Sequence, residues 1–155
     1  MTAYSGSDHR RETDMSAAEN RERMAEIYDE LAKGNRIPFR NAMAEDFRWI
    51  MKGRTAWSKT YEGRDAVREE LLRPLYAQFA DEYANKAHRI FADGDFVIVE
   101  CEGKVTTTSG KPYNNQYCLI FRLEGGKIKE MTEYLDTALV NEVLAPPPWA
   151  KPQAV

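Results

Sequence analysis

The feature that most constrains this fold is a hairpin signal in the last third of the chain. Two strand-like runs, 113–123 and 127–135, are separated by residues 124–126, which include a Gly-Gly pair. Glycine adopts positive φ angles without strain, so this pair between apolar-rich runs predicts a tight turn joining two antiparallel strands. A short amphipathic stretch follows at 137–144. We therefore expect the end of this hairpin to form one wall of any site that the protein has.

The first half of the chain reads as helices with one strand between them. Ser16 and Glu19 have the spacing of a capping box, and apolar residues then recur at helical intervals until Gly34, which predicts a first helix. The other elements expected before residue 80 are a short helix at 37–44, a strand at 46–51, a loop or broken strand at 53–60, and a third helix from Gly63 towards Phe79 that kinks or restarts at Pro74.

The second half reads as strands. Runs at 83–92 and 95–108 flank a tight turn at 93–94 and precede the hairpin. Helices followed by an antiparallel meander indicate an α+β fold, in which helices pack on one face of a curved sheet. The expected organisation is a mobile polar tail at 1–15, one domain at 16–144, and an extended Pro-rich tail at 145–155.

Charge and hydrophobicity argue against several classes of function. The net charge of −3 and isoelectric point near 5.5 disfavour nucleic-acid binding, which needs a basic surface. No stretch approaches the roughly 20 apolar residues of a membrane helix, and the N-terminus lacks the apolar core of a secretory signal, so we expect a cytoplasmic location. Cys101 and Cys118 are interpreted as buried free thiols. Two histidines far apart in sequence give no zinc site, and no cofactor is expected.

Five short motifs occur in an informative order: DFRW at 46–49, YEGRDAV at 61–67, DGDFV at 93–97, GGKI at 125–128 and EYLD at 133–136. Together they resemble the nuclear transport factor 2-like superfamily, in its SnoaL-like and ketosteroid-isomerase-like branch, over roughly residues 17–144. The resemblance implies a cone-shaped fold whose curved mixed or antiparallel sheet wraps the N-terminal helices around an apolar pocket. It also implies a homodimer formed through the sheet. It leaves activity open, because members include both enzymes and binding modules.

The resemblance assigns few catalytic residues. The oxyanion-hole and base positions of the steroid isomerases fall on Ile27, on Ile50 and on either Tyr117 or Cys118. None of these matches, so the steroid isomerase mechanism is not expected. The acid/base aspartate of the SnoaL-like polyketide cyclases follows the isoleucine of the Gly-Lys-Ile turn by eight residues, and Asp136 stands at that position here.

Two carboxylates near the end of the hairpin are candidates for proton transfer. Asp136 is either a general acid/base with a pKa raised by an apolar pocket, or the N-cap of the helix that follows, or both. Strand alternation places Glu133 on the opposite face from Asp136. A carboxyl of Glu133 that points into the pocket needs a hydrogen-bond partner. The candidate partners are Tyr28, Tyr117 and Asn115.

Aromatic and apolar side chains complete the expected site. The catalytic candidates are Asp136, Glu133 and Tyr117, and the expected pocket residues are Tyr28, Trp49, Trp57, Asn115, Leu119, Phe121 and Tyr134. Trp49 and Trp57 can serve as flat walls for a ring-shaped ligand. The alternatives are ordinary core packing for Trp49 and a lid or dimer contact for Trp57.

These residues support three hypotheses. The first is a cofactor-independent enzyme of the isomerase, cyclase, dehydratase or hydrolase type, which moves protons on a small hydrophobic ring compound. The second is a non-catalytic module that binds such a ligand in the same pocket. The third is an interaction protein whose sheet face at 97–108 recruits a different chain. The first is preferred, because a polar cluster at the end of an apolar pocket is costly unless it is used.

Overall fold

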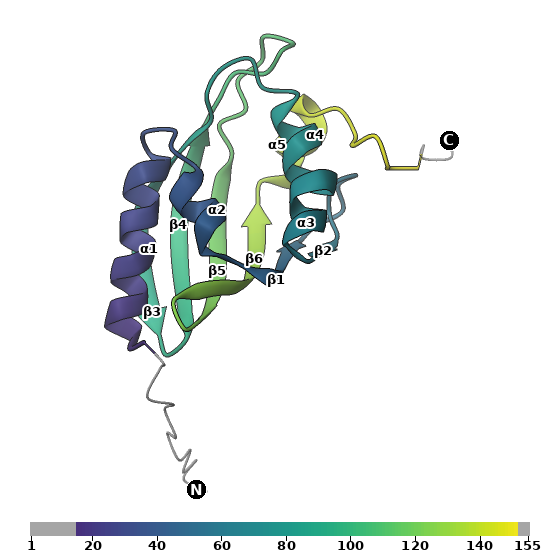
Figure 1. Cartoon of the computed structure of the whole chain (residues 1–155). Helices are drawn as coiled ribbons and strands as arrows, with labels where there is room; N and C mark the ends of the chain where they lie inside the picture. Colours follow the sequence, from purple (N-terminus) through teal and green to yellow (C-terminus); the bar gives the residue numbers. More distant parts are fainter. Residues whose placement is uncertain (1–14, 152–155) are drawn as a thin grey trace, which may run out of the picture.

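The predicted hairpin forms the centre of a six-stranded sheet in the computed structural model, which describes residues 15–151 (Figure 1). Strands β5 (Gln116–Glu124) and β6 (Lys127–Leu135) pair antiparallel across Gly125 and Gly126, whose φ angles are 56° and 76°. Two successive positive φ angles are what a two-residue hairpin turn requires. The tail expected at 1–15 lies, apart from Met15, outside the described residues.

The sheet is mixed, open and curved. Its strand order is β2-β1-β6-β5-β4-β3, and only β1 (Met43–Met51) and β6 run parallel, while β2 (Thr60–Glu62) closes one edge antiparallel to β1. Register shifts occur in β1 before Arg48 and in β6 between Ile128 and Glu130. Such irregularities bend a strand, so the sheet gains a concave face and a convex face. The predicted α+β class with a curved mixed sheet is confirmed.

The opposite edge consists of β3 (Ala84–Asp93) and β4 (Phe96–Lys104). The strand expected at 95–108 was too long, because β4 ends at Lys104. Beyond it, the amide of Thr106 bonds to the carboxylate of Asp81 at 2.7 Å, and the amide of Thr107 bonds to the carbonyl of Lys111. The β-branched run therefore forms a hydrogen-bonded loop instead of continuing the ladder.

Helix α1 (Ala17–Leu31) lies along β3 and β4 (Figure 1). The predicted capping box is confirmed: the Ser16 hydroxyl accepts from the amide of Glu19, and the Glu19 carboxylate accepts from the amide of Ser16. The predicted apolar face is buried, and Gly34, at φ 83°, follows the end of the helix. Helix α2 (Ile37–Ala42) comes next.

The segment after Gly63 is helical on both sides of Pro74. It consists of α3 (Arg64–Ala66), a π-helical stretch η1 (Val67–Leu72) and α4 (Arg73–Tyr76). Pro74 has no amide N–H to donate to the carbonyl of Glu70, four residues earlier. The indole Nε1 of Trp149 donates to that carbonyl at 2.7 Å. The helical segment therefore continues past Pro74, and the turns before the proline are the wider turns of a π-helix.

The chain after β6 packs against Trp57, in the loop after β1, and Gln78, which follows α4. Helix α5 (Thr137–Val143) is followed by a Pro-rich segment that contains a turn, in which the amide of Ala150 bonds to the carbonyl of Pro147 at 3.0 Å. The carbonyl of Ala145 accepts from Trp57 Nε1 at 3.1 Å and from the Gln78 side chain at 3.0 Å. Trp57 is therefore a buried anchor for this segment, and the lid or dimer contact considered for it is not what the structure shows.

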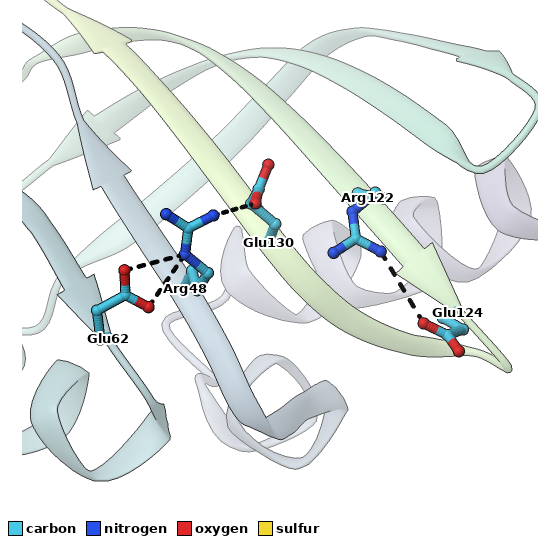
Figure 2. A network of polar contacts seen from close by, with 5 residues as sticks. All are labelled: Arg48, Glu62, Arg122, Glu124 and Glu130. Carbon is cyan, nitrogen blue, oxygen red and sulfur yellow. Dashed lines mark hydrogen bonds and ion pairs between the residues drawn. The ribbon is translucent and has the colours of Figure 1, made fainter.

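The two faces of the sheet differ in chemistry. On the convex face, Arg48 pairs with Glu62 on β2 and with Glu130 on β6, and Arg122 lies 3.9 Å from Glu124 (Figure 2). The concave face is apolar and packs against the helices. Cys101 is a buried free thiol as predicted, whereas the free thiol of Cys118 is only half-buried. Over residues 15–151, no helix has the length and apolar character to cross a membrane, and no three potential metal ligands cluster.

Candidate functional site

A cavity of about 340 Å³ lies between the concave face of the sheet and the helices. Its floor comes from β1, β5 and β6, and its sides come from α1, α2, the 67–76 helical segment and β3. The lining residues are Tyr28, Leu31, Arg36, Phe39, Arg40, Trp49, Arg68, Leu72, Arg73, Leu75, Tyr76, Phe79, Tyr83, Asn85, Tyr113, Tyr117, Leu119, Met131 and Glu133. This volume lies at the lower end of the range of small-molecule pockets.

Glu133 is the one carboxyl group among these lining residues. It lies on β6, where strand alternation turns it inward between Leu119 of β5 and Met51 of β1. Only 5% of the residue is exposed, and its Oε1 atom has no hydrogen-bond partner within residues 15–151. Burial raises the pKa of this carboxyl to about 8, with a smaller opposing effect from the Trp49 indole. At neutral pH the group is therefore mainly protonated and is a proton donor.

Trp49 forms the wall beside this carboxyl. Its ring packs edge-to-face against Phe39 and Phe47, which fixes the plane of the indole. The Nε1 atom is buried and makes no hydrogen bond of standard geometry among the described residues, although it is near enough to Glu133 to lower that pKa in part. The Trp49 N–H and one carboxyl oxygen of Glu133 thus lie at the same wall of the cavity without hydrogen-bond partners among the described residues.

Phenol groups supply the second polar region of the cavity. The Tyr83 hydroxyl lies 3.4 Å from the Tyr117 hydroxyl and accepts from Asn85 Nδ2 at 3.0 Å. The Tyr28 hydroxyl has the Cys101 thiol as a weak donor at 3.9 Å. Burial raises the pKa of Tyr28, Tyr83 and Tyr117 well above the usual value, so these phenols stay neutral and can donate hydrogen bonds. Asn85 Oδ1 remains unpartnered.

Five of the predicted site residues do line the cavity: Tyr28, Trp49, Tyr117, Leu119 and Glu133. Tyr117 is a diagonal cross-strand neighbour of Glu133, since Tyr117 opposes Leu135 and Leu119 opposes Glu133. Phe121 lies one layer behind, fully buried against Tyr28 and Phe39. Trp57 lies outside this cavity as well, because its indole is committed to Ala145.

Asn115 was expected to line the pocket, but its amide is used for structure. Oδ1 accepts from the amides of Gln116 and Asp136, and Nδ2 donates to the Tyr113 hydroxyl and the Asp136 carbonyl. The side chain thus joins the start of β5 to the end of β6 and is completely buried. Every polar atom of this amide is satisfied, which leaves none for a ligand.

Asp136 and Tyr134 also lie away from the cavity. β6 ends at Leu135, so Asp136 leaves the sheet, is exposed, and accepts from the amide of Leu139 at 3.2 Å as the N-cap of α5. The capping interpretation is therefore confirmed, and the spacing shared with the polyketide cyclases does not bring this carboxylate to the pocket. Tyr134 is 48% exposed on the convex face, because it follows the inward-facing Glu133.

Sequence reasoning missed the lining residues of α2, of the 67–76 helical segment and of β3. Alternation along β3 carried a usable signal: Tyr83 and Asn85 share a face with Ala87, so a polar pair stood on the inward side. The arginines at the mouth gave no local signal, since Arg36, Arg40, Arg68 and Arg73 come from two segments that only the tertiary fold brings together.

Solved structures resemble this fold over most of its length. A nuclear transport factor 2-like protein of unknown function from Burkholderia pseudomallei K96243 is 21% identical, with a TM-score of 0.69, and the match covers 84% of this chain and 100% of that one. A proposed SnoaL-like polyketide cyclase from Jannaschia sp. CCS1 is 21% identical, with a TM-score of 0.67, over 92% and 100% of the two chains. TerC, co-crystallised with polyporic acid, is 19% identical, with a TM-score of 0.67, over 80% and 96%.

These similarities lie below the identity at which activity transfers, so they establish the fold alone. No protein with a curated description matches the chain significantly. The model of the SnoaL-like domain family matches residues 24–131, which run from within α1 to within β6. Together with the curved mixed sheet and its cavity, that match places this chain in the SnoaL-like domain family of nuclear transport factor 2-like proteins.

Proposed function

We propose that this protein is a cofactor-independent acid/base enzyme that acts on a small hydrophobic ring compound, with Glu133 as its proton-transfer group. One observation carries the proposal: a buried carboxyl without a cationic partner faces an apolar cavity, keeps one oxygen open, and has a pKa of about 8. Carboxyls with pKa values near the working pH are efficient general acids and bases. The fold similarity to a proposed polyketide cyclase is consistent with this class of chemistry.

The geometry favours a substrate with a carbonyl oxygen at the Trp49–Glu133 wall. The protonated carboxyl of Glu133 donates its proton to that oxygen, and the Trp49 N–H donates a hydrogen bond to the same atom. The resulting carboxylate then accepts a proton released from the substrate carbon next to the carbonyl, which returns Glu133 to its starting state. Neutral phenols, Tyr28 and Tyr117, hold other oxygens of the ring compound.

Hydrogen–deuterium exchange tests this step without knowledge of the natural substrate. Enolisation of 1-tetralone, a bicyclic ketone, replaces the protons next to its carbonyl when the reaction runs in D₂O, and NMR follows the loss of signal. We expect the protein to accelerate this exchange and Glu133→Gln to lower the acceleration by about 10²–10⁴-fold. Glutamine keeps the shape and a donor of the protonated carboxyl, so 1-tetralone binding is retained. Glu130→Gln, on the opposite face of β6, is the matched control.

The pH dependence supplies a second readout. Because the protonated form of Glu133 starts the reaction, the exchange rate is constant below the apparent pKa and falls above about pH 8. Exchange that is equally fast in Glu133→Gln would contradict the proposal. So would bound 1-tetralone that shows no acceleration in the wild-type protein.

The second candidate function is non-catalytic binding in the same cavity. It is favoured by one observation: Asp136 lies outside, so Glu133 has no second carboxyl beside it among the lining residues. A carrier protein would need the cavity but would not need a second carboxyl to act as a base. Binding of 1-tetralone that survives Glu133→Gln, together with no exchange above background, would select this function.

We also propose that two copies pair through the convex face. A row of mostly apolar side chains crosses five strands there by register: Ile50, Thr132, Ile120, Ile98 and Phe91. Phe91 at its end is 52% exposed. Covering such a row would remove apolar area from water. Light scattering after gel filtration tests this, with a dimer expected for the wild type and a monomer for Ile120→Arg; a wild-type monomer would refute it.

A further inference from the structure

Four arginines surround the cavity and are not used by the proposed proton transfer. Arg36 and Arg40 border it from the start and the end of α2, and Arg68 and Arg73 border it from η1 and α4. All four side chains line the cavity while their residues are exposed, which places the cationic ends at its mouth. Long basic side chains commonly cover apolar surface with their stems and keep the charged end in water.

The two pairs of arginines differ in their partners. Arg68 and Arg73 share the carboxylate of Glu69, at 3.2 Å and 3.0 Å. For Arg36 and Arg40, no carboxylate lies within ion-pair distance in the part of the chain from 15 to 151. The guanidinium of Arg36 instead lies 3.9 Å from the centre of the Tyr76 ring, which keeps it across the mouth.

Arg36 and Arg40 also stand one helical turn apart, with the amide of Arg40 bonded to the carbonyl of Arg36. Residues at this spacing share a helix face, and like charges there repel each other. An anion between them would replace this repulsion with two attractive contacts. The interior offers no competing negative charge at neutral pH, because the one carboxyl in the lining is Glu133, which is mainly protonated.

We infer that the ligand is a ring compound bearing a carboxylate, with its apolar ring inside the cavity and its carboxylate between Arg36 and Arg40. This inference rests on the proposed function, since it assumes that the cavity binds the ring compound on which Glu133 acts. Guanidinium groups bind carboxylates with paired, charge-assisted hydrogen bonds, which suits two arginines at one mouth. The carboxylate end fixes the direction in which the ring enters, so the opposite end reaches Trp49 and Glu133.

A matched pair of probes tests this inference. 2-Naphthoate and 2-naphthamide have the same ring and nearly the same shape but differ in charge. Titration calorimetry at pH 7 in 20 mM salt should give about tenfold tighter binding of 2-naphthoate than of 2-naphthamide to the wild-type protein. In the double variant Arg36→Gln/Arg40→Gln, the affinity for 2-naphthoate should fall to that of 2-naphthamide, whose own affinity stays unchanged. Arg68→Gln, which loses an arginine already paired with Glu69, should change the preference less than about twofold.

The outcomes separate this inference from the proposed function. Equal binding of the two probes by the wild type overturns the inference alone, and so does a preference that persists in Arg36→Gln/Arg40→Gln. If neither probe binds, the cavity is not a ring-binding site and both conclusions fall. Loss of exchange activity in Glu133→Gln with the naphthoate preference intact supports both. Raising the salt to 500 mM should weaken 2-naphthoate binding only, because screening acts on the charged contact.

Discussion

Glu133 and Glu130 lie three residues apart on β6, yet the two faces of the sheet give them opposite environments. Glu130 on the convex face accepts from Arg48 at 2.9 Å and belongs to a row of ion pairs (Figure 2). Glu133 on the concave face faces the cavity, and its Oε1 atom has no hydrogen-bond partner within residues 15–151. The same residue type is therefore an ion-pair partner at one position and a buried neutral acid at the other, because strand alternation places the two side chains on opposite faces.

The difference extends beyond these two residues. Of the four buried side-chain atoms that lack a hydrogen-bond partner within residues 15–151, three border the cavity: Trp49 Nε1, Asn85 Oδ1 and Glu133 Oε1. On the convex face, acidic and basic side chains instead pair with each other, as Arg48 does with Glu62 and Glu130 and Arg89 does with Glu100. Unsatisfied buried groups lower stability, so their concentration at one cavity supports the ligand site proposed above.

The largest effect expected from this contrast is a loss of stability with rising pH. Below about pH 4.5 Glu133 is protonated in both states, whereas between about 4.5 and 8 the unfolded chain releases this proton and the folded chain keeps it. The folded state is thereby disfavoured progressively across this window, by about 4–5 kcal/mol in total. Urea unfolding of Glu133→Gln between pH 5 and 9 should show this decline abolished.

Glu130→Gln is the control for that experiment, because it removes a carboxyl from the same strand without touching the cavity. It should keep the wild-type decline between pH 5 and 8. Groups whose pKa is lowered, such as Asp46 beside Lys129, act at the acidic end and leave this window unaffected. A wild-type protein with constant stability from pH 5 to 8 would show that Glu133 is ionised in the folded state, and the contrast between the faces would be lost.

Much of this arrangement was readable from local sequence. The Gly-Gly turn, the capping box at Ser16 and the alternation that separates Glu133 from Asp136 all depend on residues within a few positions of one another. The bulge in the hairpin lies between Glu130 and Ile128, before the part of β6 that carries the site. The alternation from Glu130 onward was therefore undisturbed, and the choice of Glu133 as a pocket candidate followed from it.

The errors came from contacts between distant segments. Trp57 looked like a loop residue near the pocket, but its indole meets Ala145, 88 residues later. Asn115 was expected to line the pocket, but its side chain bonds to Asp136 across the hairpin. The arginine pair on α2 gave no periodic signal because it becomes meaningful only once α2 borders the cavity. Such partners are set by tertiary packing, which local patterns do not encode.

Asn115 differs from Glu133 because it is a buried polar group whose hydrogen bonds are all formed within the chain. Replacing it with alanine removes four hydrogen bonds and leaves the Asp136 amide and the Tyr113 hydroxyl without this partner. We expect Asn115→Ala to cost about 2–4 kcal/mol of unfolding free energy at pH 5. Glu133→Gln at the same pH should stay within about 0.5–1 kcal/mol of wild type, since it removes no formed hydrogen bond. Equal losses in the two variants would mean that Glu133 has a structural partner after all.

Asp136 stands at the position of the acid/base aspartate of the polyketide cyclases, and variants of this residue test whether it takes part in proton transfer. Its carboxylate accepts from the Leu139 amide and stands outside the cavity. Asp136→Ala should therefore cost about 1 kcal/mol through loss of the N-cap, and Asp136→Asn less, because asparagine also caps well. Both variants should exchange 1-tetralone protons at the wild-type rate. A loss of exchange in Asp136→Asn with stability unchanged would move the proton-transfer role from Glu133 to Asp136.

The smallest effect belongs to Glu130, the convex counterpart of Glu133. Arg48 has a second carboxylate, Glu62, so it keeps a partner when Glu130 is neutralised. The side chains of this ion-pair row remain partly exposed, and solvent screens them. Glu130→Gln should lower the unfolding free energy at pH 7 by less than about 1 kcal/mol, and the difference from wild type should shrink further in 1 M salt. A larger, salt-insensitive loss would mean that Glu130 is as isolated from water as Glu133, and that pairing rather than burial is what separates the two faces.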